Sequence, residues 1–397
     1  MLCFSMSEAG YERVFGFIDE EALVKTTREL IAFRSVNPPG NEGEIGRYVA
    51  DVMEEACMEV EFQSVHPGRL NVLGRLGNRG LGPCLLLNGH MDVVPPGEGW
   101  SSEPFDAVVR GGRVYGRGAA DMKGGLAAML EAVKAVDGAG VSLKGCLLVS
   151  AVVNEERGGS GTRFMVDAGV KPDAAVVCEP TGLEVKTCHK GALPLEFVTR
   201  GRSVHASMPH GGVNAVYKMC DVIHGLRQYG EELARVRHPL LSPPTISVDV
   251  IDGGIAPNVV PNLCKAIVDT RLVPGETVEG RLQAVKSLLD ALRVEDPELD
   301  VEFHPIIAVE PMETPVDSML VKMLRSVVEE VQGVEGVVSG FTATCDASFL
   351  ANIAHTPTVI YGPGRLEQAH TADEYVEVRE LVAAAKTYAA LALRFLS

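Results

Sequence analysis

The chain has 397 residues, of which 46% are hydrophobic and 22% charged, a composition typical of a soluble globular protein with room for two domains. Its formal net charge of -17, with no cluster of Lys and Arg, argues against a nucleic-acid backbone or an anionic membrane surface as partner. Nine scattered cysteines form no CxxC pair, the amino terminus shows no signal-peptide pattern, and no apolar run is long enough for a membrane helix. We therefore expect a protein of the reducing cytoplasm.

Strand-like and helix-like segments alternate along the first half of the chain and resume near its end. Helical spacing of apolar residues predicts helices over 20–35, 43–58, 122–136 and 160–169. Apolar runs predict strands over 70–76, 84–90, 145–153, 173–179 and 356–362. Strands that alternate with helices indicate an α/β domain with a mostly parallel sheet covered by helices on both faces.

A different order of elements occupies residues 186–302. Strands are expected over 193–201, 244–254, 262–275 and 298–305, and helices over 213–236 and 276–294. The resulting order β-α-β-β-α-β is that of a ferredoxin-like α+β fold. We predict that this domain is inserted into the larger α/β domain, which is formed by residues 1–185 and 303–397.

Histidine and acidic residues follow the predicted strands of the larger domain. They are His90 at the end of 84–90 and Asp92 just after it, Glu155 and Glu156 after 145–153, Glu179 at the end of 173–179, and His370 after 356–362, with Asp121 in a glycine-rich segment before a predicted helix. Ligands of open α/β sheets bind outside the carboxyl ends of the strands, so these side chains are expected to share one edge. Imidazole and carboxylate without thiolate suit zinc, cobalt or manganese, and a shared carboxylate could bridge two ions about 3.5–4 Å apart.

Each of these residues alone also has an ordinary structural role. A histidine at a strand end is usually solvated or hydrogen-bonded, and aspartate commonly caps a helix or forms a turn. The polar segments "NEERGG" and "EPTG" could be a loop and a turn. Because all of these roles would have to coincide at one sheet edge, we favour a metal centre.

Five motifs, "GHMDVVP", "YGRGAADMKGG", "NEERGG", "CEPT" and "QAHTADEYV", together resemble the signatures of the dinuclear zinc deacylases and peptidases. That family includes acetylornithine deacetylase, succinyl-diaminopimelate desuccinylase, aminoacylase and glutamate carboxypeptidase, and the resemblance spans nearly the whole chain. It implies that His90 and Glu179 bind one ion, that Glu156 and His370 bind the other, and that Asp121 bridges them.

The resemblance also assigns roles to two further acidic residues. Asp92 would orient His90, which raises the basicity of the ligand, and Glu155 would be the general base. The family further implies a cis peptide bond between Asp121 and Met122.

The inserted domain carries three more candidates by the same resemblance, and the segment "GPG" adds two glycines. His205, in "GRSVHASMPHGGVNAV", would stabilise the oxyanion. In dimeric members of the family the matching histidine comes from the partner subunit, which implies a homodimer formed through the inserted domain, a lid over the active site. Asn258, in "GGIAPNVVPN", would contact substrate. Arg271 could bind a substrate carboxylate or form a surface ion pair, and the backbone N–H groups of Gly362 and Gly364 could bind a carboxylate or lie in a plain tight turn.

These observations predict metal-dependent hydrolysis of the amide bond of an N-acyl amino acid, with two divalent ions as cofactors. Zinc is the first choice, and cobalt and manganese are the alternatives. A dipeptidase or carboxypeptidase on the same scaffold is the second reading, because both kinds of substrate carry a free carboxylate. A catalytically silent homologue that binds a metabolite or a protein is the third.

Overall fold

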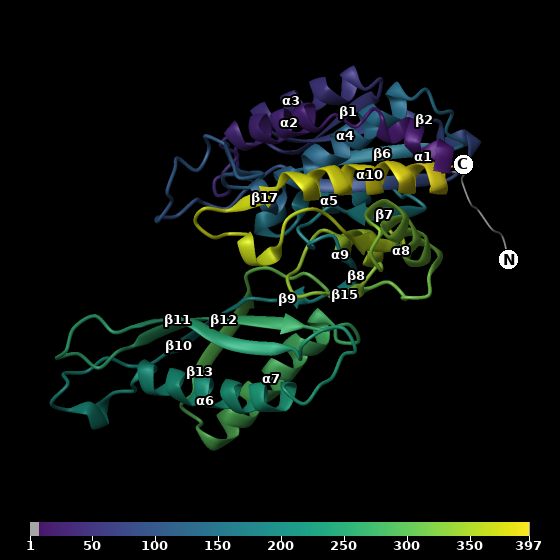
Figure 1. Ribbon diagram of the computed structural model, residues 1–397. Helices are drawn as coiled ribbons and strands as arrows, with labels where there is room; N and C mark the ends of the chain where they lie inside the picture. The colour runs from purple at the N-terminus through teal and green to yellow at the C-terminus, as the bar shows by residue number, and fades with distance from the viewer. Residues whose placement is uncertain (1–7, 397) are drawn as a thin grey trace. The chain divides into compact units, whose positions relative to one another are not determined.

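The computed structural model describes residues 8–396, which form two compact units (Figure 1). The inserted unit consists of His189–Met312 and Thr342–Thr344, where the sequence predicts an insertion over 186–302. The other described residues form the larger unit. Among the described residues, no helix is both long enough and apolar enough to cross a membrane.

The larger unit is built on a nine-stranded sheet with the order β1-β2-β6-β3-β7-β16-β8-β14, to which β15 is added beside β8. Its strands are β1 (Glu59–His66), β2 (Arg69–Gly77), β3 (Cys84–His90), β6 (Cys146–Val152), β7 (Ala174–Val177), β8 (Val185–His189), β14 (Met312–Glu313), β15 (Val338–Phe341) and β16 (Thr358–Ile360). The central strands β6, β3, β7 and β16 are parallel, and antiparallel strands flank them. The predicted α/β class with a mostly parallel sheet is confirmed.

Helices cover both faces of this sheet (Figure 1). They are α1 (Glu8–Phe15), α2 (Glu20–Ala32), α3 (Gly43–Glu55), α4 (Gly124–Gly138), α5 (Ser160–Asp167), α8 (Met319–Gln332), α9 (Ala347–Asn352) and α10 (Val378–Phe395). Helix α4 packs against β3, α2 and α10, and nearly all of its residues are buried, as expected for a helix with apolar residues on every side. Helices α5 and α9 pack against each other and against other strands of the sheet.

A second, three-stranded sheet joins two segments that are far apart in the sequence. Its strands β4 (Val108–Arg110), β5 (Arg113–Tyr115) and β17 (Tyr375–Glu377) are antiparallel, with β5 in the middle. Strand β5 shortly precedes Asp121, and β17 shortly follows His370. The small sheet therefore brings the chain segments around these two predicted ligands together.

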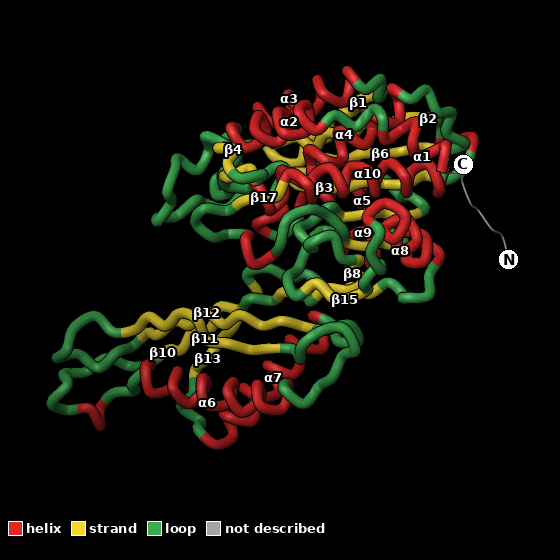
Figure 2. The backbone as a smooth tube through the Cα atoms, viewed as in Figure 1, coloured by secondary structure: helices red, strands yellow, loops and turns green. Residues whose placement is uncertain are grey.

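The inserted unit has the predicted ferredoxin-like order. Its elements are β9 (Gly191–Ala192), β10 (Leu195–Arg200), α6 (Ala215–Leu233), β11 (Thr245–Gly253), β12 (Leu263–Leu272), α7 (Val278–Glu295) and β13 (Asp300–Pro305). The antiparallel sheet has the order β11-β12-β10-β13, and Figure 2 shows α6 and α7 on one side of it. Alternate residues of β10 and β12 point into the core between this sheet and the two helices, which explains the alternation read from the sequence.

Candidate metal centre

Four of the five predicted ligands lie at or after the ends of the four central parallel strands, which lie side by side in the sheet. His90 is the last residue of β3, and Glu156 lies in the short helical turn Glu155–Arg157 that follows β6. Glu179 follows β7, and His370 lies in the segment after β16. The carboxyl ends of the parallel strands thus deliver these side chains to one edge of the sheet, as the order of the elements predicts.

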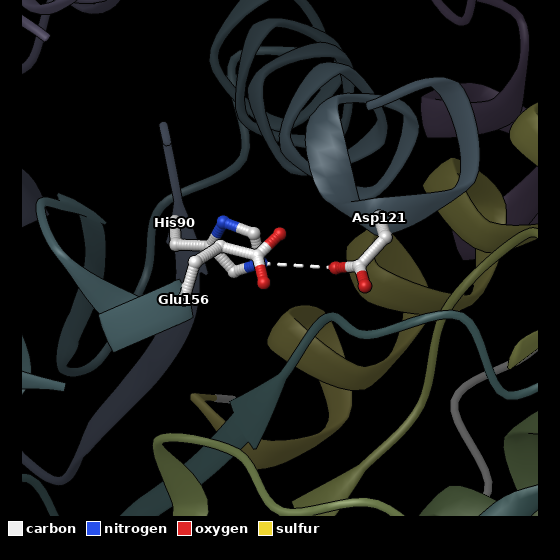
Figure 3. A group of neighbouring side chains, drawn as sticks. All are labelled: His90, Asp121 and Glu156. Carbon is white, nitrogen blue, oxygen red and sulfur yellow. Dashed lines mark hydrogen bonds and ion pairs between the residues drawn. The ribbon is translucent and has the colours of Figure 1, made fainter. Parts of the chain in front are cut away.

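Asp121 lies between the two histidines. Its Oδ1 is 3.0 Å from His90 Nε2, and its Oδ2 is 3.3 Å from His370 Nε2. His370 Nε2 is also 3.2 Å from Glu156 Oε2, and His90 Nε2 is 3.8 Å from Glu179 Oε1. The carboxylate of Asp121 therefore faces two histidine–glutamate pairs, with one oxygen toward each, and Figure 3 shows it directed at His90.

The backbone at this point has an unusual conformation. Asp121 lies in the segment Ala119–Lys123 before α4, where it and Met122 have non-helical φ and ψ, and the peptide bond between these two residues is cis. The resemblance implies this cis bond. His370 has a positive φ of 61°, a backbone region that non-glycine residues seldom adopt and that occurs at functional sites.

Two sets of described side chains bring three potential ligand atoms within 4.8 Å of one another: His90, Asp121 and Glu156, and His90, Glu155 and Glu179. The donors are imidazole nitrogens and carboxylate oxygens, which bind zinc, cobalt or manganese. The Oε1 atom of Glu156 is buried without a hydrogen-bond partner, and a buried polar atom of this kind needs a partner. The residues present therefore fit a pair of divalent cations.

Electrostatics at this edge also favours bound cations. Burial raises the pKa values of Glu155 and Glu179, and neighbouring carboxylates raise them further. Burial opposes protonation of His90, but the carboxylates of Asp121, Glu179 and Glu155 outweigh this effect and raise its pKa. Hydrogen bonds with Asp121 and Glu156 raise the pKa of His370 to about 10. Without a cation, the cluster of carboxylates can be neutralised only by taking up protons.

The side chain of Asp92 does not orient His90 in the way that the resemblance implies. His90 Nδ1 lies 2.9 Å from the backbone carbonyl of Asp92, whereas the carboxylate Oδ1 is 3.7 Å away. The carboxylate instead accepts hydrogen bonds from the backbone N–H groups of Glu155 and Glu156 and from Asn37 Nδ2. Because a carbonyl only accepts, Nδ1 of His90 carries the hydrogen, and Nε2 is directed at Asp121. Asp92 therefore orients His90 through its backbone and the two glutamates through its side chain.

The prediction that "GPG" offers free backbone donors to a substrate is wrong. The N–H of Gly362 donates to Thr181 Oγ1 over 3.1 Å, and the N–H of Gly364 donates to Glu380 Oε2 over 2.9 Å. A Cβ atom at Gly362 would lie 2.5 Å from the carbonyl oxygen of Cys178. This glycine therefore permits the close approach of two backbone segments, and its donor is already used within the protein.

The chain segments that carry His205 and Asn258 pair with each other in the inserted unit. The backbone N–H of Ala206, next to His205, donates to the carbonyl of Asn258, and the backbones of His205 and Val259 form a β-bridge. Nδ1 of His205 accepts a hydrogen bond from the backbone N–H of Ser207, so the neutral ring carries its hydrogen on Nε2. Both His205 and Asn258 are exposed.

Arg271 is held within the inserted unit by polar neighbours. Its Nε atom contacts both carboxylate oxygens of Asp269 at 2.8 and 2.9 Å, and Nη1 is 3.5 Å from Thr344 Oγ1. The ion pair is partly exposed. The surface ion pair that the sequence left open as an alternative is thus present.

Sequence reasoning missed two polar residues that bond to the predicted site residues, and the arginine that is paired with one of them. Asn37 bonds the carboxylate of Asp92, and Glu374, which is paired with Arg117, accepts hydrogen bonds from the backbone at Asp121. Glu374 lies in the motif "QAHTADEYV" only four positions after His370, which is the one sequence signal that could have drawn attention to it.

The family model of Peptidase family M20/M25/M40 matches residues 86–394. This range is most of the chain and includes all of the predicted ligands. The chain belongs to this family. It is therefore a metal-dependent hydrolase of amide or peptide bonds, as the sequence motifs predict.

Three relatives place the family assignment in context. The chain is 29% identical, over 95% of both chains, to an N-formyl-4-amino-5-aminomethyl-2-methylpyrimidine deformylase from Halalkalibacterium halodurans. The structure of the present chain is similar to that of a tripeptidase from Staphylococcus aureus, with a TM-score of 0.80 and 22% sequence identity. The match covers 96% of this chain and 99% of the tripeptidase chain. A dinuclear metal-binding peptidase of family M20 from Bacillus subtilis matches with a TM-score of 0.70 and 16% identity, covering 95% and 98%. The last two comparisons show the shared fold.

The stability of the metal-free M20 protein is expected to fall as the pH rises above about 5, where the unfolded carboxyl groups have lost their protons. The pKa values of Glu155, Glu179 and His90 are raised in the folded state, so the folded protein holds protons that the unfolded chain has already released. Unfolding then releases protons and becomes more favourable at higher pH. Thermal unfolding in chelator and in excess zinc, across this pH range, checks the prediction. A melting temperature in chelator that stays constant or rises with pH would contradict it.

Proposed function

We propose that this M20 protein is a deacylase that hydrolyses the amide bond of N-acyl amino acids with two divalent metal ions, zinc in the first place. The observation that carries the proposal is the placement of Asp121 between His90 and His370, with Glu155 beside His90. Glu155 Oε2 lies 3.9 Å from His90 Nε2, and its side chain is largely buried. The proposed ligands are His90, Asp121, Glu156, Glu179 and His370.

In the proposed mechanism, Glu155 accepts the proton of the attacking water and later delivers it to the departing amine nitrogen. The raised pKa of Glu155, caused mainly by burial, suits a group that must both accept and return a proton near neutral pH. The bound ions would lower the pKa of that water and polarise the acyl carbonyl. Asp92 holds the backbone N–H groups of Glu155 and Glu156, and thereby keeps the base and a ligand in place.

His205 is proposed to donate from Nε2 to the oxygen of the tetrahedral intermediate. The hydrogen bond at Nδ1 fixes the tautomer that this role requires. Asn258 would contact the substrate. Its backbone carbonyl accepts a hydrogen bond from the N–H of Ala206, the residue that follows His205. In dimeric family members this histidine comes from the partner subunit, and we propose a homodimer formed through the inserted unit.

Replacement of His205 by Ala is expected to lower kcat about 10²- to 10³-fold and to leave KM nearly unchanged. The interaction with the oxyanion exists only in the transition state, so its loss does not weaken substrate binding. Steady-state kinetics on the best substrate, with His224→Ala on α6 as the matched control, checks this. A rise in KM with unchanged kcat would contradict the oxyanion role.

The substrate class has one competing candidate. The structural neighbour from Staphylococcus aureus is a tripeptidase, which favours a peptidase as the second reading, whereas the relative from Halalkalibacterium halodurans is a deformylase. Both readings require the same metal centre and the same base. Arg271 is proposed to bind the substrate carboxylate in either case, although its Nε already pairs with Asp269.

The test is a hydrolysis screen followed by mass spectrometry. The panel contains N-acetyl, N-formyl and N-succinyl amino acids, an N-formyl aminomethylpyrimidine and simple dipeptides, each incubated with zinc or cobalt and separately with chelator. Metal-dependent release of one acyl class would support the proposal and name the acyl group. Cleavage of dipeptides alone would favour the peptidase, and a protein that binds metal but hydrolyses nothing would favour the silent binding homologue.

The cellular setting is also part of the proposal. The described cysteines are free, and several of them are buried in the core, as expected in a reducing compartment. We therefore propose that the protein acts in the cytoplasm on small molecules, without nucleic acid or membrane as partner.

A further inference from the structure

The side chain of Glu374 accepts two hydrogen bonds from the backbone that carries Asp121. Its Oε1 accepts hydrogen bonds from the backbone N–H of Ala120 over 2.9 Å and from that of Asp121 over 3.1 Å. We propose that Glu374 is a positioning residue, which fixes the backbone so that the carboxylate of Asp121 stays between His90 and His370. The inference rests on the proposed function in so far as Asp121 is taken to bridge two metal ions.

The carboxylate of Glu374 is itself held rigidly. The side chain is fully buried, and Oε2 accepts a hydrogen bond of 2.5 Å from Nη1 of Arg117, which is also buried. The guanidinium of Arg117 donates from Nη2 to the carbonyl of Pro96 and lies over the ring of Trp100. A buried ion pair with these additional contacts has little freedom to move, so it can serve as a fixed reference for the backbone that it binds.

Glu374 also connects the Asp121 segment to the His370 segment. Its backbone carbonyl accepts a hydrogen bond from the N–H of Gly116, and the strand β17, which begins at the next residue, pairs with β5. Next to it, Asp373 Oδ1 accepts hydrogen bonds from both the backbone N–H and the hydroxyl of Ser101. Two of the proposed ligands, separated by most of the chain, are thus held in one hydrogen-bonded unit.

The chemistry of a carboxylate suits this position. The N–H groups of Ala120 and Asp121 lie in the segment just before α4, where Asp121 and Met122 have non-helical φ and ψ, and both donate to Glu374 Oε1. A carboxylate can accept both bonds on one oxygen and pair with Arg117 through the other. A glutamine of the same shape keeps one acceptor oxygen but directs an NH₂ group either at these N–H donors or at the guanidinium, so one of the two contacts is lost.

The decisive variant is Glu374→Gln, compared with Glu374→Asp, Arg117→Lys and the matched control Glu276→Gln. Glu276 forms an ion pair with the buried Arg281 in the inserted unit, which contains none of the five proposed ligands. Each full-length variant is stripped of metal and titrated with cobalt in competition with a chromophoric chelator. The absorption spectrum of the bound cobalt is recorded in parallel, because it reports the ligand geometry directly and needs no substrate.

We expect Glu374→Gln to weaken the binding of at least one ion by about 10-fold or more and to change the cobalt spectrum, as outer contacts to metal ligands commonly do. Arg117→Lys, which leaves the Glu374 carboxylate in place, should have a smaller effect of the same kind, and it decides the matter if the glutamine variant does not fold. Glu276→Gln should lower the melting temperature and leave the cobalt affinity and the cobalt spectrum unchanged.

Wild-type affinity and an unchanged cobalt spectrum in a folded Glu374→Gln would overturn the inference, as would an equal loss of affinity in Glu276→Gln. A wild-type protein that binds no divalent ion would overturn it together with the proposed function. A wild-type protein that binds two ions but releases no acyl group would defeat only the deacylase proposal.

Discussion

Replacement of Glu155 by Gln is expected to lower kcat about 10²- to 10⁴-fold while the protein keeps both metal ions. Glutamine has the same shape as glutamate but cannot take up the proton of the attacking water. The structure makes the separation of roles testable, because Glu155 lies within 3.9 Å of His90 Nε2 and could in principle be a ligand instead of the base. Metal content per chain and kcat, measured on the same preparation, check the prediction.

The matched control is Glu54→Gln, an exposed glutamate on α3. This variant should retain both metal content and turnover. If Glu155→Gln lost one metal ion along with its activity, Glu155 would be a ligand, and the assignment of the general base would be wrong. If it kept full activity, no proton transfer through Glu155 would be needed.

Replacement of Asp121 by Asn is expected to weaken metal binding by more than about 100-fold and to abolish hydrolysis. Asp121 is the only proposed ligand that contacts both histidines, so an amide at this position leaves each ion without a shared anionic oxygen. The loss should exceed the effect of outer contacts such as that of Glu374. Isothermal titration with zinc and a thermal shift with and without zinc measure it.

The control for this variant is Asp51→Asn on the exposed side of α3. Zinc should raise the melting temperature of the wild-type protein and of the control equally, because an ion that binds only the folded state stabilises it. An Asp121→Asn protein that zinc stabilised as strongly as the wild type would show that Asp121 does not bridge the ions.

The central strands could be predicted because they are buried on both faces. β3 and β6 are buried along their whole length, and their sequences are the continuous apolar runs that parallel strands require. Strand β1 was not predicted, since most of its residues are exposed and its sequence, "EVEFQSVH", gives no continuous run. The short strands β4, β5 and β17 were missed because their pairing joins distant segments and leaves no local pattern.

The candidate ligands could be predicted for a related reason. Charged residues directly after buried strands are rare unless something binds them, and the fold delivers them to one edge. The contacts made through the backbone could not be predicted. The bond from the N–H of Asp121 to Glu374 spans 253 residues, and the donors at Gly362 and Gly364 are used by side chains whose positions the local sequence does not reveal.

The most direct test of the account is a zinc titration of chelator-treated protein, in which bound metal per chain and release of amine from an N-acyl amino acid are followed together. We predict that two ions bind per chain and that activity rises with occupancy of the second ion. Asp121→Asn should weaken metal binding by more than about 100-fold and abolish the release of amine. Binding of no zinc, or binding of two ions that Asp121→Asn leaves intact, would contradict a dinuclear centre at this edge of the sheet.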